Sequence, residues 1–307
     1  MDVLKSRIES KELFVWRSLY ARSELTSDEK YYYRTLEKGY EGELMFDQLT
    51  KGLQSDVYIL NGLLFEINNS YFQIDTLLIA PQKIYVFDVK NSEGDYLYED
   101  EKFRRLRGGN DLKNPLHQLE RCETLLRQFL KKLGYHLPID GQIVFINPEF
   151  TLYQAPHDKP IIFPTQLNQL VQQLNTIPSK LSKRHTDLAD QLMSAHQNEY
   201  PFSKYPPYQF DQLKKGKMCA MCHSLSTFQR DRRLVCNDCG HEEAIEAAFL
   251  RAVTELRLLF PDRKITTNLV YEWCGEGRDE GGSRKRVVRI LRKNLGSKGY
   301  GRWIYYE

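Results

Sequence analysis

The sequence predicts an α/β protein in which a mixed sheet flanked by helices precedes a cysteine-containing segment and a small basic α+β domain. Three observations support this fold class. Helical spacing gives way to three closely spaced strand-type runs, then to an amphipathic helix and further strands. Four of the six cysteines form two Cys-x-x-Cys pairs. The length of 307 residues suits two domains of roughly 150 residues, with room for a small third one.

The first expected elements are helices. Apolar and aromatic residues recur at helical spacing over residues 1–36, which indicates a helical extension of two helices with a break near 26–28. A further helix is expected over 41–53, after Gly39. Strand-type runs follow at 58–67, 71–80 and 84–89, separated by turn residues.

The pattern then alternates between helix and strand. A helix over 115–133 has Asn114 as its candidate N-cap and Pro115 at its first position. Strands are expected at 141–147 and 159–163, and a helix at 165–174, while three Pro and three Tyr within 200–208 indicate a linker. The expected boundaries are a helical extension at 1–36, a sheet domain at 37–199, a linker at 200–215, a cysteine segment at 216–243 and a basic domain at 244–307.

Composition excludes several classes of protein. No run approaches the roughly 18 consecutive apolar residues of a membrane span, and the first residues lack the apolar region of a secretory signal. Six cysteines are too few for a disulfide scaffold in a chain of this length. We therefore expect a cytoplasmic protein with no membrane partner.

The charge is unevenly distributed along the chain. The net charge is only +3, but residues 211–307 contain 19 Lys and Arg against 13 Asp and Glu, whereas residues 1–210 contain 25 against 28. Residues 281–307 alone contain 8 basic residues and 1 acidic residue. Such asymmetry indicates a nucleic-acid partner, although charge runs usually form solvated faces.

Polar residues interrupt the apolar strands. Asp75 lies within one strand, and Asp88 and Lys90 lie at the end of the next, where alternation places them on the same face. A carboxylate inside an apolar strand is costly unless it is paired or binds a cation. Two such carboxylates beside a lysine suit Mg²⁺, and Glu43 on the preceding helix would complete the cluster. Lys90 would orient or deprotonate a water, or stabilise charge on a phosphate. Taken alone, Asp-x-Lys is more often an edge ion pair, and a lone buried Asp is more often a turn or cap residue.

The order of these motifs resembles that of a known family. The residues that carry the resemblance are the stretches 39–43 (GYEGE), 72–79 (FQIDTLLI) and 84–91 (IYVFDVKN), then Gly94, Asn114-Pro115 and Gln118. Together they resemble the NERD (nuclease-related) domain, a branch of the PD-(D/E)xK nuclease superfamily, over about residues 37–150. The resemblance implies a restriction-endonuclease-like fold in a bacterial protein.

The resemblance also implies a metal-dependent phosphodiesterase site. Asp75 and Asp88 would hold Mg²⁺ or Mn²⁺, and Lys90 would be the catalytic lysine. Glu43 would be the helix-borne acid and Gln118 an accessory residue. The family more often has Glu at the position of Asp88, but the superfamily accepts either residue. No residue of the signature is missing, which argues against an inactive relative.

The two Cys-x-x-Cys pairs form the strongest single motif. Cys219 and Cys222 are separated from Cys236 and Cys239 by 13 residues. Four thiolates at two such turns predict a tetrahedral Zn²⁺ site, and Gly240 follows the second pair as zinc-ribbon turns often require. The alternative is two reducible cysteine pairs. A four-thiolate site leaves no open position for water, so we expect a structural role.

The C-terminal region resembles a winged helix-turn-helix. Helices are expected at 244–260, 265–273 and 284–295, followed by a glycine turn and an aromatic strand at 302–306. In such a domain the third helix enters a major groove. The alternative is a helical subdomain that packs on the nuclease domain. The expected nucleic-acid contacts are Arg284, Lys285, Arg286, Arg289, Arg292, Lys293 and Lys298.

These features predict a metal-dependent nuclease that hydrolyses DNA phosphodiester bonds, with the zinc ribbon and the winged helix as DNA-binding modules. A second hypothesis is a non-catalytic DNA-binding protein that uses the nuclease fold as a scaffold. A third is a zinc-stapled module whose basic C-terminal part binds an acidic protein. DNA is the expected partner, and RNA stays an alternative.

Overall fold

The computed structural model describes residues 1–108, 113–178, 180–276 and 281–307. The chain divides into two compact units. The first comprises Met1–Ser10 and Thr35–Phe202, and the second comprises Lys11–Arg34 and Ser203–Glu307. The extension expected over residues 1–36 is therefore shared between the units: residues 1–10 lie with the main sheet, and residues 11–34 belong to the second unit.

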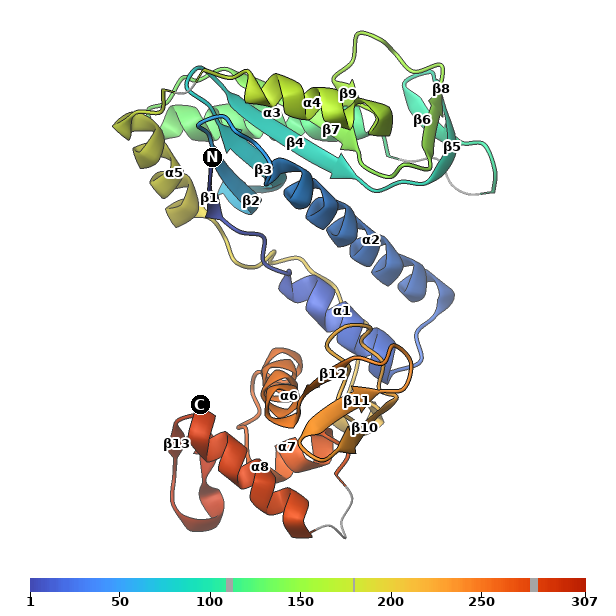
Figure 1. Cartoon of the computed structure of the whole chain (residues 1–307), viewed down its shortest axis with the longest axis vertical. Coiled ribbons are helices and arrows are strands. Elements are labelled where there is room, and N and C mark those ends of the chain that lie inside the picture. The colour runs from blue at the N-terminus through green and yellow to red at the C-terminus, as the bar shows by residue number, and fades with distance from the viewer. Residues whose placement is uncertain (109–112, 179, 277–280) are drawn as a thin grey trace. The chain divides into compact units, whose positions relative to one another are not determined.

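A six-stranded mixed sheet organises the first unit (Figure 1). Its central strands β2, β3 and β4 form the predicted antiparallel meander. The pairs β1–β2, β4–β7 and β7–β9 are parallel. In spatial order the strands are β1 (Asp2–Lys5), β2 (Tyr58–Ile67), β3 (Ser70–Ile79), β4 (Ile84–Lys90), β7 (Ile139–Phe145) and β9 (Ile161–Ile162).

Helices cover both faces of this sheet, which confirms the predicted fold class. On one face, α3 (Pro115–Lys132) and α5 (Lys183–Ala195) bury their apolar residues against the strands. On the other face, the C-terminal part of α2 (Ser27–Thr50) and α4 (Leu167–Asn175) do the same, and the turn η1 (Pro164–Gln166) precedes α4. α3 begins as predicted, because the Asn114 side chain accepts the Leu116 N–H at 2.9 Å.

The pleat of β2 and β3 is interrupted at one level. Ile74 and Leu77 pack in the same core although they are three positions apart, and a regular strand would place them on opposite faces. Leu60 and Leu63 on β2 show the same change of phase. Gly62 between them has a φ of 61°, a conformation that favours glycine. This interruption lies beside the first of the predicted acids.

A second, three-stranded sheet was not predicted from the sequence. It has the order β6-β5-β8 and consists of β5 (Gly94–Glu99), β6 (Lys102–Arg105) and β8 (Phe150–Tyr153). The hairpin of β5 and β6 turns at Asp100 and Glu101, whose φ values are 50° and 57°. Turns of this kind usually contain Asn-Gly or Asp-Gly, so an Asp-Glu turn carries no recognisable signal.

Two predictions for the N-terminal region are wrong. Residues 2–5 form β1 rather than the start of a helix, because they pair with β2. Pairing within the tertiary structure outweighs the weak local spacing. Gly39 does not separate two helices, since α2 continues without a break from Ser27 to Thr50. One glycine inside a helix costs only about 1 kcal/mol, which packing of the helix offsets.

The second unit combines α1 with the cysteine segment and the basic region. Its helices and turns are α1 (Lys11–Arg22), η2 (Phe210–Gln212), α6 (Ile245–Leu259), α7 (Thr267–Trp273), α8 (Gly281–Asn294) and η3 (Gly301–Trp303). Its strands are β10 (Thr227–Arg230), β11 (Arg233–Cys236) and β12 (Glu242–Ala244) in one antiparallel sheet, and the pair β13 (Ser297–Lys298) and β14 (Tyr305–Tyr306). The order of three helices and a hairpin is the one expected of a winged helix, and that assignment stays a prediction.

A buried ion pair joins α1 to the basic region. The Arg22 guanidinium binds the Glu255 carboxylate at 2.8 and 2.7 Å and lies 4.1 Å from the centre of the Trp273 ring. The Trp273 indole donates to the same carboxylate at 3.0 Å. Burial of such charges is tolerated because the guanidinium also donates to the Lys214 and Gly216 carbonyls, at 2.7 and 3.0 Å.

Among the described residues, no helix has both the length and the apolar character that crossing a membrane demands.

Candidate functional site

The two acids predicted as metal ligands share one small cavity. Thr76 pairs with Phe87 in the antiparallel register of β3 and β4, so the next positions, Asp75 and Asp88, lie opposite each other. Both residues line a cavity of about 10 Å³ together with Gln118 of α3. That volume is close to the space that a single water needs. The cavity that both acids line therefore has room for one small ion or water.

Lys90, at the end of β4, connects these groups. Its ammonium donates to Asp88 Oδ1 at 2.8 Å and to Gln118 Oε1 at 3.1 Å. Burial lowers the pKa of Lys90, but the carboxylates of Asp88, Asp75 and Glu43 outweigh burial and hold the pKa above its ordinary value. Lys90 is therefore a fixed positive charge beside the acids.

A glycine lets α2 bring Glu43 to the same cluster. A Cβ on Gly42 would lie 2.5 Å from the Cβ of Asn91, so a side chain at this position would push α2 away from the end of β4. Asn91 secures the contact, because its amide donates to the Lys38 carbonyl of α2 at 2.8 Å and its oxygen accepts from Asn147 at 3.0 Å. The stretch 39–43 thus sets the position of Glu43.

Sequence reasoning missed one residue of the cluster. The Arg7 side chain is 2% exposed and contacts Glu43 and Asp47 of α2 and the Asp75 carbonyl of β3. These partners lie 36, 40 and 68 positions further along the chain. No local pattern links residues so far apart, so the sequence carried no signal that could have identified Arg7.

The charges of the cluster suit a divalent cation. Burial, reinforced by Glu43 and Asp88, raises the pKa of Asp75 well above its ordinary value. Burial also raises the pKa of Glu43, and Arg7 opposes this effect. Asp88 Oδ2 is buried and has no hydrogen-bond partner among the described residues. An unpaired buried carboxylate oxygen is costly, and such oxygens are the ligands that Mg²⁺ and Mn²⁺ prefer. These residues therefore fit the predicted metal.

The raised pKa of Asp75 predicts a stabilising substitution. Without divalent ions, we expect Asp75→Asn to raise the melting temperature at neutral pH by about 2–4 °C, the shift that roughly 1 kcal/mol produces in a domain of 150–250 residues. Because the folded state raises the pKa of Asp75, the free energy of unfolding falls as the pH rises above 3.8, the ordinary pKa of this side chain. Asparagine does not ionise, so the variant avoids this loss. The amide oxygen can still accept the Val89 N–H, which Asp75 Oδ2 accepts at 2.9 Å.

Calorimetric melting between about pH 4 and about pH 8 tests this expectation. The difference between Asp75→Asn and the wild type should grow with pH. Asp158 is an exposed turn residue, and Asp158→Asn should show no such growth. An Asp75→Asn variant that melts at or below the wild-type temperature at neutral pH contradicts the expectation.

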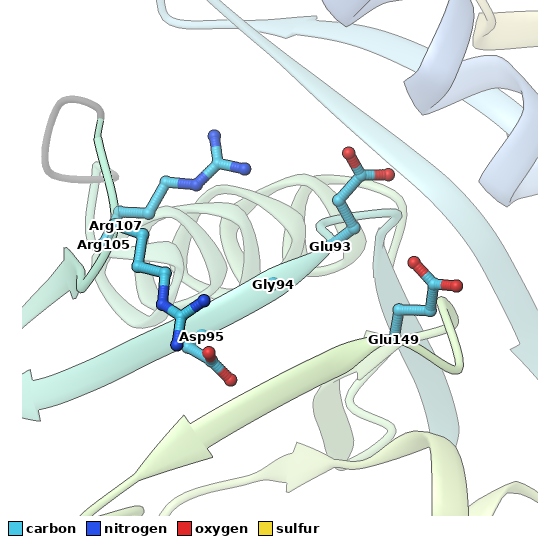
Figure 2. Close-up of a pocket in the computed structure, with 6 residues that line it drawn as sticks. All are labelled: Glu93, Gly94, Asp95, Arg105, Arg107 and Glu149. Atoms are coloured by element: carbon cyan, nitrogen blue, oxygen red, sulfur yellow. The ribbon is translucent and has the colours of Figure 1, made fainter.

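A larger pocket lies on the second sheet of the same unit. It has a volume of about 340 Å³, and Figure 2 shows its lining side chains. Acids and arginines are mixed there. We assign the candidate site to the smaller cavity. Carboxyl groups with shifted pKa values beside a lysine held in place indicate a functional site better than a large cavity volume does. The residues that line the larger pocket are Glu93, Gly94, Asp95, Arg105, Arg107 and Glu149.

The four cysteines of the second unit come together as predicted. Their sulfur atoms all lie within 4.8 Å of one another. The Cys219 and Cys239 sulfurs are 3.6 Å apart, and the Cys222 and Cys236 sulfurs are 3.5 Å apart. A tetrahedral site with Zn–S bonds of about 2.3 Å places its sulfurs about 3.8 Å apart. β10 and β11 connect the two cysteine pairs and β12 follows the second pair, so the cluster and its three strands fit a Cys₄ zinc ribbon.

The two cysteine turns have the same backbone form. The His223 N–H donates to the Cys219 carbonyl at 3.2 Å, and the Gly240 N–H donates to the Cys236 carbonyl at 3.1 Å. His223 and Gly240 have φ values of 59° and 72°. Burial would raise the pKa of Cys236, but the backbone N–H groups of the second turn lower it to about 7. Burial raises the pKa of Cys222 in the first turn to about 12, so without a metal the thiolate form is favoured at Cys236 and not at Cys222.

The predicted nucleic-acid contacts lie on α8 and the hairpin after it. The apolar face of α8 is buried as expected, through Val287, Ile290 and Leu291. All of the predicted contact residues are exposed except Arg286, which is half-buried. Arg284 donates to Asn268 at 2.6 Å. Arg286 donates to Gln229 at 2.6 Å, Lys293 pairs with Glu246 at 2.9 Å, and Lys298 pairs with Glu307 at 2.5 Å.

Sequence reasoning did not single out two exposed aromatic side chains of this hairpin. Tyr300 is 92% exposed and Trp303 is 73% exposed. Both follow β13 and precede β14. Both residues follow the basic helix α8 by a few positions in the sequence. Only the structure shows that their rings are exposed and not part of the core.

Comparison with known families identifies one part of the chain. Residues 38–146 match the family model of the NERD domain, the nuclease-related domain. No curated protein and no solved structure matches the chain. The matched stretch contains Asp75, Asp88 and Gln118, which line one cavity. It also contains Lys90, which bonds to Asp88 and Gln118, and Glu43, whose charge acts on Asp75. Residues 38–146 of this chain are therefore a NERD nuclease-related domain, as the order of the motifs predicts.

Proposed function

We propose that this protein is a divalent-metal-dependent nuclease that hydrolyses DNA phosphodiester bonds. The observation that supports the proposal most directly is the cavity between Asp75 and Asp88, where Asp88 Oδ2 is buried without a partner among the described residues and Lys90 is fixed alongside. The match to the nuclease-related domain supports the same reaction class.

Each side chain of the cluster has a role that its contacts suggest. Asp75 and Asp88 would hold Mg²⁺ or Mn²⁺, which supplies Lewis-acid polarisation of a phosphate oxygen and a bound water. Lys90 donates two of its three N–H groups to Asp88 and Gln118, which leaves the third for a phosphate oxygen. A fixed ammonium stabilises the charge that develops on the phosphate during cleavage. Gln118 orients Lys90, and Glu43 offers a carboxylate to an attacking water.

For the second unit, we propose that the four cysteines bind structural Zn²⁺ and that the exposed side of α8 binds the nucleic-acid backbone. Lys285, Arg289 and Arg292 are exposed on that helix. The rings of Tyr300 and Trp303 are suited to stack on bases or to contact a groove. Lys293 and Lys298 are exposed too, but each pairs with an acid, so they contribute less to phosphate binding than Lys285, Arg289 and Arg292 do.

The exposed arginines of α8 give a salt-dependence prediction. We expect the double variant Arg289→Ala and Arg292→Ala to weaken duplex DNA binding and to reduce the slope of log K against log salt by about 2, since each lost phosphate contact removes about 0.9. Fluorescence anisotropy over a salt series measures this slope. Arg257→Ala, which removes an exposed arginine of α6, is the matched control and should leave the slope unchanged. An affinity that does not vary with salt in the wild type contradicts the proposed surface.

A cleavage panel tests the proposed function. Linear, nicked, branched and single-stranded DNA, with RNA in parallel, are incubated with Mg²⁺, with Mn²⁺ or with EDTA, and Lys90→Ala serves as the control. Cleavage that requires the divalent ion and Lys90 supports the nuclease. Tight binding without cleavage of any substrate would support the alternative, in which the nuclease fold is a scaffold for recognition.

A further inference from the structure

We propose that Arg7, which precedes the matched domain in the sequence, is a positioning residue of the metal site. This inference rests on the proposed function, because it names a residue that holds the acids in place. It concerns a segment outside residues 38–146, the stretch that matches the nuclease-related domain.

Arg7 connects the two elements that carry the acids. Its Nε and Nη2 donate to the two carboxylate oxygens of Asp47 at 2.9 Å each, and its Nη1 donates to Glu43 Oε2. Nη2 also donates to the Asp75 carbonyl at 2.8 Å and to Thr76 Oγ1 at 3.2 Å. One guanidinium thus joins α2, which carries Glu43, to β3, which carries Asp75.

The bond from Arg7 to β3 lies where the regular side-chain alternation of the strand is interrupted. Asp75 lies at the level at which the side-chain alternation of β2 and β3 changes phase, opposite Gly62. An interrupted pleat leaves local backbone groups without regular strand partners. Arg7 takes up the Asp75 carbonyl directly, and Lys5 donates to the Asn61 and Gly62 carbonyls at 2.7 and 2.9 Å. Lys5 therefore supports β2 and Arg7 supports β3 at the interruption.

The charge and shape of arginine are both needed at this place. Asp47 receives two parallel N–H groups, a geometry that the fork of a guanidinium provides and an ammonium does not. The Arg7 side chain is 2% exposed, so its positive charge is balanced only by the surrounding acids. With Asp47 held in this way, Arg7 offers Glu43 a single charge-assisted bond and leaves the other Glu43 oxygen free of the guanidinium.

Direct binding of Mn²⁺ to the full chain, measured by titration calorimetry, tests the inference. We expect Arg7→Lys to keep the fold and to weaken Mn²⁺ binding by about 10–100-fold, the range seen when residues that orient metal ligands are replaced. Asp47→Asn disturbs the same fork without touching Glu43, and should weaken binding by a smaller factor. Lys83→Met is the matched control, because Lys83 lies at the other end of β4, where it pairs with Asp140. It should leave the Mn²⁺ affinity within about twofold.

The outcomes separate this inference from the proposed function. If Arg7→Lys binds Mn²⁺ as the wild type does, Arg7 does not position the metal site, whatever the cleavage assay shows. If Arg7→Lys does not fold, the affinity of Asp47→Asn decides, and wild-type affinity in that variant overturns the inference. A wild type that binds Mn²⁺ but cleaves nothing overturns the proposed function alone. A wild type that binds no Mn²⁺ overturns both.

Discussion

Replacing Lys90 with alanine is expected to lower the rate of Mg²⁺-dependent DNA cleavage by about a hundredfold to a thousandfold, the usual cost of losing one preorganised charge-stabilising donor. The Lys90 ammonium lies 2.8 Å from Asp88 Oδ1 and 3.1 Å from Gln118 Oε1, so its position is fixed before any substrate arrives. Such a group needs no rearrangement when charge develops on the phosphate. Single-turnover cleavage of a labelled duplex at saturating enzyme measures the effect without a contribution from binding.

Two controls make this result interpretable. Lys83 lies at the other end of β4, where it pairs with Asp140 at 2.5 Å, and Lys83→Ala should cleave at the wild-type rate. Because Lys90→Ala leaves the Asp88 carboxylate without its cation, its melting temperature is measured in parallel, so that a loss of fold is not mistaken for a loss of chemistry. Cleavage by Lys90→Ala at the wild-type rate would show that the reaction takes place elsewhere.

The sequence predicts the parts of the fold whose pattern is local. The strands of the meander, the capped helix α3 and the two cysteine turns each have a periodicity or spacing of their own, and the structure has them within a few residues of the predicted bounds. β1 and the hairpin of β5 and β6 were missed for a different reason. β1 is a strand because β2 provides its hydrogen-bond partners, and the Asp100-Glu101 turn has no glycine to mark it.

The residues of the candidate site likewise fall into those that a local sequence pattern predicts and those that it does not. Asp75, Asp88 and Lys90 interrupt apolar strands, so their type and place are visible in the sequence, and the register of β3 and β4 brings the two acids together. Arg7 is invisible because its partners lie 36 or more positions away. For the basic residues of α8, composition does not predict which side chains have acidic partners. The sequence predicts a basic helix, but only the structure shows that one of its exposed basic residues, Lys293, pairs with Glu246.

Removing zinc is expected to unfold the ribbon of residues 216–243. Structural zinc in small Cys sites contributes about 10–16 kcal/mol of binding free energy, and that energy is also folding energy. The ribbon strands are only 4, 4 and 3 residues long, so they have little core of their own. We therefore expect Cys236→Ser, or prolonged chelation, to release the zinc and to expose this segment to limited proteolysis.

The matched control for this prediction is the other cysteine of the second unit. Cys274 is buried outside the cluster, so Cys274→Ala loses apolar contacts but no ligand. Elemental analysis should find zinc in Cys274→Ala and in the wild type, and little in Cys236→Ser. Because the ribbon packs on α6 within the same unit, loss of zinc should also weaken duplex DNA binding, while Mn²⁺ binding by the first unit stays unchanged. A zinc-free chain whose residues 216–243 resist proteolysis as the wild type does would show instead that the cysteine turns hold their form without a metal.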